Sequence, residues 1–100
     1  MLIVAGTFRI DPEKLDAVVA LQGPLMEEVR AEVGCQAYVF SNDTQDPGVQ
    51  HLFEIWDDEG SLAAHARAPH MAAYREAMQA LGAMQSREIK RYDVSDVKPL

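Results

Sequence analysis

The stretch VQHLFEIWD at residues 49–57 decides the fold, because it is apolar on both of its sides. As a β-strand it places Leu52 and Trp56 on one face and Phe53 and Ile55 on the other. Helices can cover only one face of a sheet, and a large apolar face left in water marks an interaction surface. We therefore expect two copies of the chain to pack these faces together about a two-fold axis.

Three more strands are predicted around this one. The segment from Cys35 to Asn42 precedes it, and the polar turn between them ends in Asp46-Pro47-Gly48, which predicts a β-hairpin. Leu2 to Ile10 is rich in β-forming residues, and Met84 to Val94 carries alternating charges. The sheet is therefore expected to have four strands.

A long helix is predicted between the first two strands. Asp11 and Pro12 form a helix start, and apolar residues follow at three-to-four spacing as far as Val33, with Gly34 as the stop. Pro24 lies inside this segment and has no N–H to donate, so we expect a kink or a break there.

The second helical segment is predicted in two pieces. Asp57 or Asp58 caps a short helix, Pro69 ends it and begins another, and Gly82 ends that one. The order β-α-β-β-α-β is that of an α+β, ferredoxin-like plait with one antiparallel sheet. We expect residues 1–94 to form a single domain and residues 95–100 a tail that is poorly ordered or lies on a partner.

Charge and composition exclude several classes of function. Sixteen acidic residues against nine Lys and Arg give a net charge of −7, which disfavours binding to nucleic acid or to an anionic membrane. A lone cysteine, Cys35, excludes an intrachain disulfide and fits a reducing compartment. No stretch approaches the ~20 apolar residues of a membrane span, and no basic leader is present, so we expect a cytoplasmic protein.

Several motifs together resemble the antibiotic biosynthesis monooxygenase family. They are Phe53-Glu54-Ile55-Trp56, Ser61-Leu62-Ala63-Ala64-His65, Ala68-Pro69-His70-Met71 and Ile89-Lys90-Arg91-Tyr92-Asp93-Val94. With the element order, the resemblance covers Leu2 to Val94. It implies a homodimeric α+β barrel joined through the sheets, with a small-molecule site between sheet and helices in each subunit. Several members oxidise phenols, quinols or polyketide rings with O₂ and without a metal, flavin or haem, whereas others process signalling compounds or degrade haem.

The resemblance places two catalytic candidates, His65 and Arg75. A neutral imidazole can take a proton near pH 7, and a phenolate gives an electron to O₂ far more readily than the phenol does, so His65 is the candidate base. Its alternative role is structural, with a hydrogen bond to Glu54 or to backbone. Arg75 would stabilise a substrate anion and developing superoxide, or else lie solvated on the helix surface.

Four further residues are predicted to contact a small aromatic substrate: Trp56, Tyr74, Glu54 and His70. For the Trp and Tyr, core packing is the competing interpretation, and His70 could equally be a solvated residue at a helix start. A carboxylate on the inward face is costly unless paired. Glu54 could hold His65 in one tautomer or bind Arg75 or Arg91.

We expect no metal site. His65 and His70 are five residues apart across Pro69, which is not the spacing that puts two ligands on one face of a helix, and no third ligand is predicted nearby.

Two departures from the family pattern narrow the range of expected substrates. Leu52 and Leu62 replace an Asn and a Tyr of the polyketide oxidisers, which makes the pocket more apolar and argues against a large polyhydroxylated polyketide. The haem-degrading branch needs an Asn and a Trp where this chain has Gly6-Thr7 and His65. The sequence thus favours a cofactor-independent monooxygenase acting on a small phenolic, quinol or polyketide-like aromatic. The alternative is a dimeric-barrel protein that binds or isomerises a small metabolite without redox chemistry.

Overall fold

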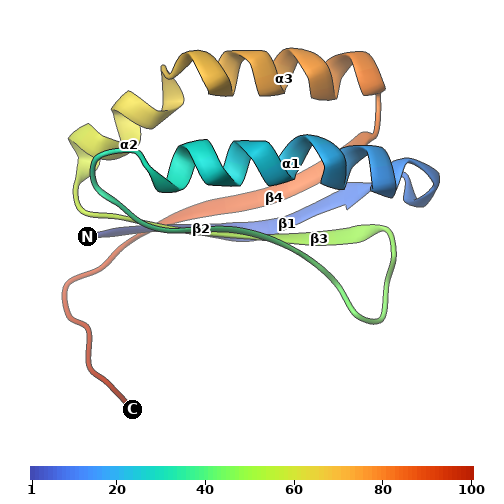
Figure 1. Ribbon diagram of the computed structural model, residues 1–100. Helices are drawn as coiled ribbons and strands as arrows, with labels where there is room; N and C mark the ends of the chain where they lie inside the picture. The colour runs from blue at the N-terminus through green and yellow to red at the C-terminus, as the bar shows by residue number, and fades with distance from the viewer.

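The computed structural model describes all 100 residues and contains four strands and three α-helices. In chain order they are β1 (Leu2–Ile10), α1 (Leu15–Arg30), β2 (Cys35–Asn42), β3 (Val49–Trp56), α2 (Glu59–Ala66), α3 (Pro69–Leu81) and β4 (Met84–Asp93). A single 3₁₀ turn, Pro12–Lys14, precedes α1. The strands form one antiparallel sheet in the order β2-β3-β1-β4, and all the helices lie on one of its faces (Figure 1). The predicted α+β, ferredoxin-like plait is confirmed.

The predicted alternation along β3 is also confirmed. Leu52, Glu54 and Trp56 are buried beneath the helices, whereas Phe53 points to the opposite face and is 42% exposed. The hairpin partner β2 brings Tyr38 opposite Glu54, so both strands contribute to the floor under the helices. The core is formed by this inward face together with the apolar stripe of α1.

Helix α1 differs from its prediction at two places. It continues without interruption through Pro24, whose ring lies on the exposed side while Val18, Leu25 and Val29 are buried against the sheet. Burial of that stripe offsets the loss of one helical hydrogen bond, so of the predicted kink or break the break does not occur. The helix also ends at Arg30, and Val33 is 90% exposed rather than part of the stripe.

The other predicted helix boundaries hold. Asp58 caps α2 by accepting a hydrogen bond from the backbone N–H of Ser61, and Pro69 begins α3. Gly82 ends α3 with φ +65°, a left-handed conformation that glycine adopts at little cost. None of these helices is both long and apolar enough to cross a membrane.

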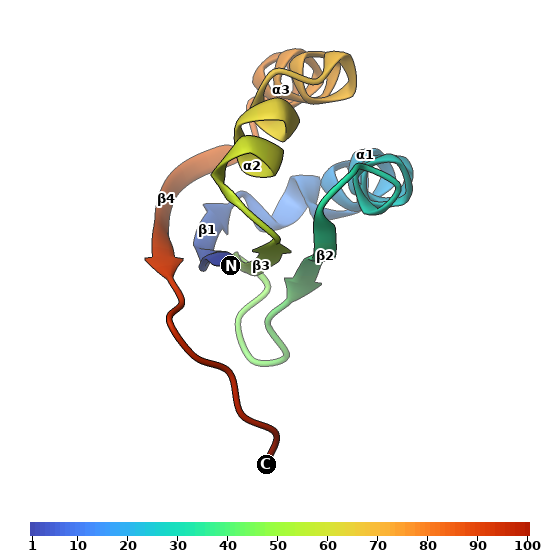
Figure 2. The same ribbon diagram turned by 90° about the vertical axis from the view of Figure 1, so that its left-hand side faces the viewer.

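The second face of the sheet carries no helix (Figure 2). Strand registry gathers apolar side chains on it, including Ile3, Val39, Phe53, Ile55 and Tyr92. Tyr92 is half exposed and Val39 about a third. Residues 94–100 form no regular element, and the chain leaves the domain on this same open side (Figures 1 and 2). We refer to this apolar surface as the open sheet face.

Candidate active site

A cavity of about 370 Å³ lies between the inward face of the sheet and helices α2 and α3. Ten of its fourteen lining residues are hydrophobic. Four of the six predicted site residues line it: Glu54, His65, Tyr74 and Arg75. A mostly apolar cavity with a few converging polar groups is the usual form of a small-molecule site.

A second hollow, of about 390 Å³, lies between α1 and α3. Of the predicted site residues it contains only His70 and Tyr74, and its other charged residue is Glu28. It holds no buried acid–base pair, so the cavity beneath α2 and α3 is the better candidate for chemistry.

The innermost polar group of the cavity is the pair Glu54 and His65, which are 5% exposed each. Trp56 donates a hydrogen bond from its Nε1 to Glu54 Oε1 at 2.8 Å, and His65 Nε2 lies 3.9 Å from the same oxygen. The rings of Trp56 and His65 are 4.7 Å apart between centroids. Trp56 is fully buried and lies behind the cavity wall rather than in it, so it reaches the site through Glu54.

Burial raises the pKa of Glu54 above its ordinary value, because removing a carboxylate from water disfavours the charged form. The hydrogen bond from Trp56 and the nearby His65 oppose this shift without cancelling it. Of the partners considered for Glu54, His65 is the nearest, but at 3.9 Å it lies beyond hydrogen-bond distance. The two arginines considered bind elsewhere: Arg75 donates to the Ala66 carbonyl oxygen at 3.3 Å, and Arg91 donates to Asp93 and Glu59.

This raised pKa leads to a prediction about stability. Below pH ~4 the carboxyl is protonated in the folded and unfolded chains alike and imposes no penalty. As the pH rises, the Glu54 carboxyl ionises first in the unfolded chain. The free energy of unfolding of the wild type therefore falls until the pH passes the pKa that Glu54 has in the folded chain. Glu54→Gln keeps an acceptor for Trp56 and avoids this loss. We expect it to become progressively more stable than the wild type between pH 4 and 7, by about 1.4 kcal/mol for each unit of raised pKa.

Urea denaturation at a series of pH values measures this difference. Glu27→Gln, an exposed change on α1, serves as the matched control and should stay within ~0.5 kcal/mol of the wild type throughout. If the free energy of unfolding of Glu54→Gln changed with pH in parallel with that of the wild type, the buried carboxyl would impose no desolvation cost.

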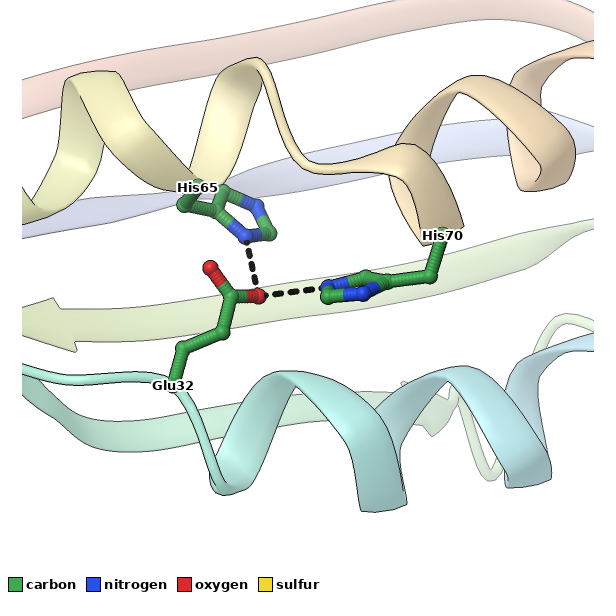
Figure 3. Close-up of side chains that lie close together, drawn as sticks. All are labelled: Glu32, His65 and His70. Carbon is green, nitrogen blue, oxygen red and sulfur yellow. Dashed lines mark hydrogen bonds and ion pairs between the residues drawn. The ribbon is translucent and has the colours of Figure 1, made fainter.

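On its other side, His65 takes part in a cluster that the sequence did not predict. Glu32, in the loop after α1, places one carboxylate oxygen 3.0 Å from His65 Nδ1 and 2.7 Å from His70 Nε2 (Figure 3). The expectation that the two histidines have no third ligand nearby is wrong. The two histidines lie on different helices, α2 and α3, so the spacing of ligands on one helix does not apply to them. The chain turns between the two helices so that both rings point to Glu32.

Glu32 also fixes the tautomer of His65. A carboxylate only accepts hydrogen bonds, so the proton of a neutral His65 lies on Nδ1. Its Nε2 then faces Glu54 with a free lone pair. An imidazole held in this way by a carboxylate is an oriented proton acceptor.

The remaining predicted residues lie further from this centre. Tyr74 accepts a hydrogen bond at its hydroxyl from Gln22 Nε2 at 3.2 Å, and burial raises the pKa of its phenol. Gln22 in turn forms a reciprocal amide pair with Gln50, with distances of 2.7 and 2.6 Å. Arg75 lines the cavity but is itself exposed. The spacing of the apolar stripe includes Gln22, and strand alternation places Gln50 on the inward face, but no pattern in the sequence predicts that the two amides pair.

The known proteins that resemble this chain point to one family. The sequence profile described as antibiotic biosynthesis monooxygenase matches residues 1–77. A solved antibiotic biosynthesis monooxygenase is 30% identical, with a TM-score of 0.84 over 96% of this chain and 100% of that one. A Deinococcus radiodurans protein proposed to be an antibiotic biosynthesis monooxygenase is 25% identical, with a TM-score of 0.90 over 100% and 98% of the two chains. An uncharacterized Synechocystis protein is 29% identical over 99% of this chain and 67% of its own length.

Proposed function

The chain belongs to the antibiotic biosynthesis monooxygenase family, and on this premise we propose that it oxidises a small phenolic, quinol or polyketide-like aromatic with O₂ and without a cofactor. The observation that carries the proposal is the placement of His65. Its Nδ1 is held by Glu32, and its ring lines an apolar cavity beside Glu54. Cofactor-independence is taken from the chemistry of the family.

In this proposal His65 takes the proton of the substrate hydroxyl at Nε2. The phenolate transfers one electron to O₂, and the resulting phenoxyl and superoxide radicals combine at a ring carbon that bears a hydrogen. The O–O bond then breaks, and the departing oxygen leaves as water with the proton held by His65 and the hydrogen of that carbon, which leaves a quinone. One oxygen atom of O₂ enters the ring and the other leaves as water. The apolar lining excludes bulk water and so strengthens the electrostatic interactions of the charged intermediates. Arg75, at the cavity, is the candidate partner for negative charge on the substrate or on superoxide.

The second candidate function is binding or isomerisation of a small oxygenated metabolite. The hydrophobic majority of the lining favours it, because such a cavity retains a ligand whether or not it is oxidised. An isomerase would use the same His65 to move a proton, and its product would have the mass of its substrate.

Oxygen uptake with a panel of quinols and naphthols, followed by mass spectrometry, tests the proposal. We expect uptake and a product that has gained one oxygen and lost two hydrogens. A change in Trp56 emission without any product would favour the binding function, and a product of unchanged mass would favour isomerisation. Either result would contradict the proposed oxidation.

We also propose that the protein is a homodimer joined through the open sheet face. Phe53, with 42% of its surface exposed, lies among the apolar side chains of that face. We expect the wild type to sediment with twice the mass of the chain and Phe53→Lys to sediment as a monomer, because a charge would be buried without a partner. Val19→Lys is the matched control, since Val19 is 43% exposed but lies on α1. It should remain dimeric; a monomeric wild type at micromolar concentration would exclude this architecture.

A further inference from the structure

We propose that Glu32, His65 and His70 form a binding site for a divalent transition-metal ion of the Zn²⁺ or Co²⁺ type. The three side chains come from the loop after α1, from α2 and from α3, and they point toward one another (Figure 3). Their nearest ligand atoms, one carboxylate oxygen and two imidazole nitrogens, all lie within 4.8 Å of one another.

The spacing suits a metal of this size. Ligand atoms bound to zinc at ~2.0–2.1 Å stand roughly 3 Å apart. Glu32 Oε2 already lies 3.0 Å from His65 Nδ1 and 2.7 Å from His70 Nε2. An ion would displace the two imidazole protons that now bond to Glu32, and rotation of the side chains would bring the two nitrogens, which lie within 4.8 Å of each other, to ligand spacing.

The far nitrogens of both imidazoles strengthen the case. His65 Nε2 lies 3.9 Å from Glu54 Oε1, and His70 Nδ1 lies 3.5 Å from Glu28 Oε2. Metal-binding histidines almost always have a carboxylate, a carbonyl or water at the nitrogen that does not bind the ion, because this partner orients the ring and raises its basicity. Here a carboxylate oxygen lies near the far nitrogen of each ring, at the limit of hydrogen-bond distance for His70 and beyond it for His65.

Charge and access fit the same ion. The carboxylates around the two histidines are those of Glu28, Glu32 and Glu54, and none is paired with a lysine or an arginine. The cluster is therefore anionic when its histidines are neutral. Two imidazoles with one carboxylate suit zinc, iron, cobalt or nickel better than magnesium or calcium. The side chain of His70 is 24% exposed and that of Glu32 is 16% exposed, so an ion can reach the cluster from solvent. Three protein ligands leave at least one coordination position for water.

Titration of the chelator-treated protein with metal ions tests this site and does not depend on turnover. Calorimetry with ZnCl₂ should give one ion per chain, and Co²⁺ should produce visible absorption bands of a low-coordinate site. His70→Ala and Glu32→Gln should lose binding. Glu28→Gln removes only the outer carboxylate and should weaken binding about 10-fold. Circular dichroism of each variant establishes that it is folded.

The matched control is His51→Ala. His51 forms the other His–carboxylate pair of the chain, with 2.9 Å between its Nε2 and Asp43 Oδ2, but no third ligand joins it. This variant should bind as the wild type does. The proposal is overturned if the wild type gives neither heat nor cobalt absorption, or if folded His70→Ala binds as tightly as the wild type. Either result would make the cluster a hydrogen-bonded clasp between α2, α3 and the loop after α1. An ion on His65 Nδ1 would move the imidazole proton to Nε2 and so block the role of that nitrogen as base; the proposed oxidation is therefore that of the metal-free protein. Because the measurement is binding, its failure would leave that oxidation untouched.

Discussion

His65→Gln is expected to lower the rate of aromatic oxidation by ~10²–10⁴-fold, the usual contribution of a general base. Glutamine can still donate a hydrogen bond to Glu32 and fills a similar volume, but it has no basic nitrogen to face Glu54. The loss should therefore appear in kcat more than in KM. Oxygen uptake at saturating substrate is the measurement, with urea denaturation to show that the variant is folded.

The substrate supplies the internal control for this prediction. A more acidic phenol is already ionised at neutral pH and needs no base, so the loss in His65→Gln should shrink as the phenol becomes more acidic. A merely structural role for His65 would lower the rate for every phenol by the same factor. Equal uptake by wild type and variant would contradict the proposed proton transfer altogether.

The fold and the inner wall of the site could be predicted from short-range patterns. Strand alternation depends on backbone geometry alone, so the two faces of β3 followed directly from Leu52, Phe53 and their neighbours. Capping chemistry is equally local, and Asp58 and Gly82 mark helix ends where the sequence indicated them. These signals need no knowledge of what packs against them.

The metal-binding candidate could not be predicted in this way, because Glu32 meets His65 across 33 positions of sequence. A glutamate at the end of an amphipathic helix usually faces solvent. It turns inward here because α1 ends at Arg30, two residues before it. The sequence predicts that the helical stripe continues to Val33. In a helix of that length Glu32 would have a different orientation, so its contact with His65 could not be predicted.

Trp56 is expected to have the largest effect on stability of any single residue of the site. It is the largest fully buried side chain. Trp56→Ala should therefore lower the free energy of unfolding by about 3–5 kcal/mol, the range found for such changes, because of the cavity it leaves. Trp56→Phe retains most of the ring but removes the donor to Glu54 Oε1, and should cost about 1–3 kcal/mol. Val33→Ala, at a residue 90% exposed, is the control and should change stability by less than ~0.5 kcal/mol.

The pH dependence separates packing from the hydrogen bond in Trp56→Phe. The indole N–H lowers the pKa of Glu54 by stabilising the carboxylate, so its removal lets burial raise that pKa further. The variant should therefore lose more stability at pH 7, where the unfolded chain is ionised and the raised folded pKa opposes ionisation, than at pH 4, where the carboxyl is mostly protonated in both states. Loss of packing alone is independent of pH. Urea denaturation at both pH values distinguishes the two, and an equal loss at each would mean that Trp56 supports the site only by filling space beneath it.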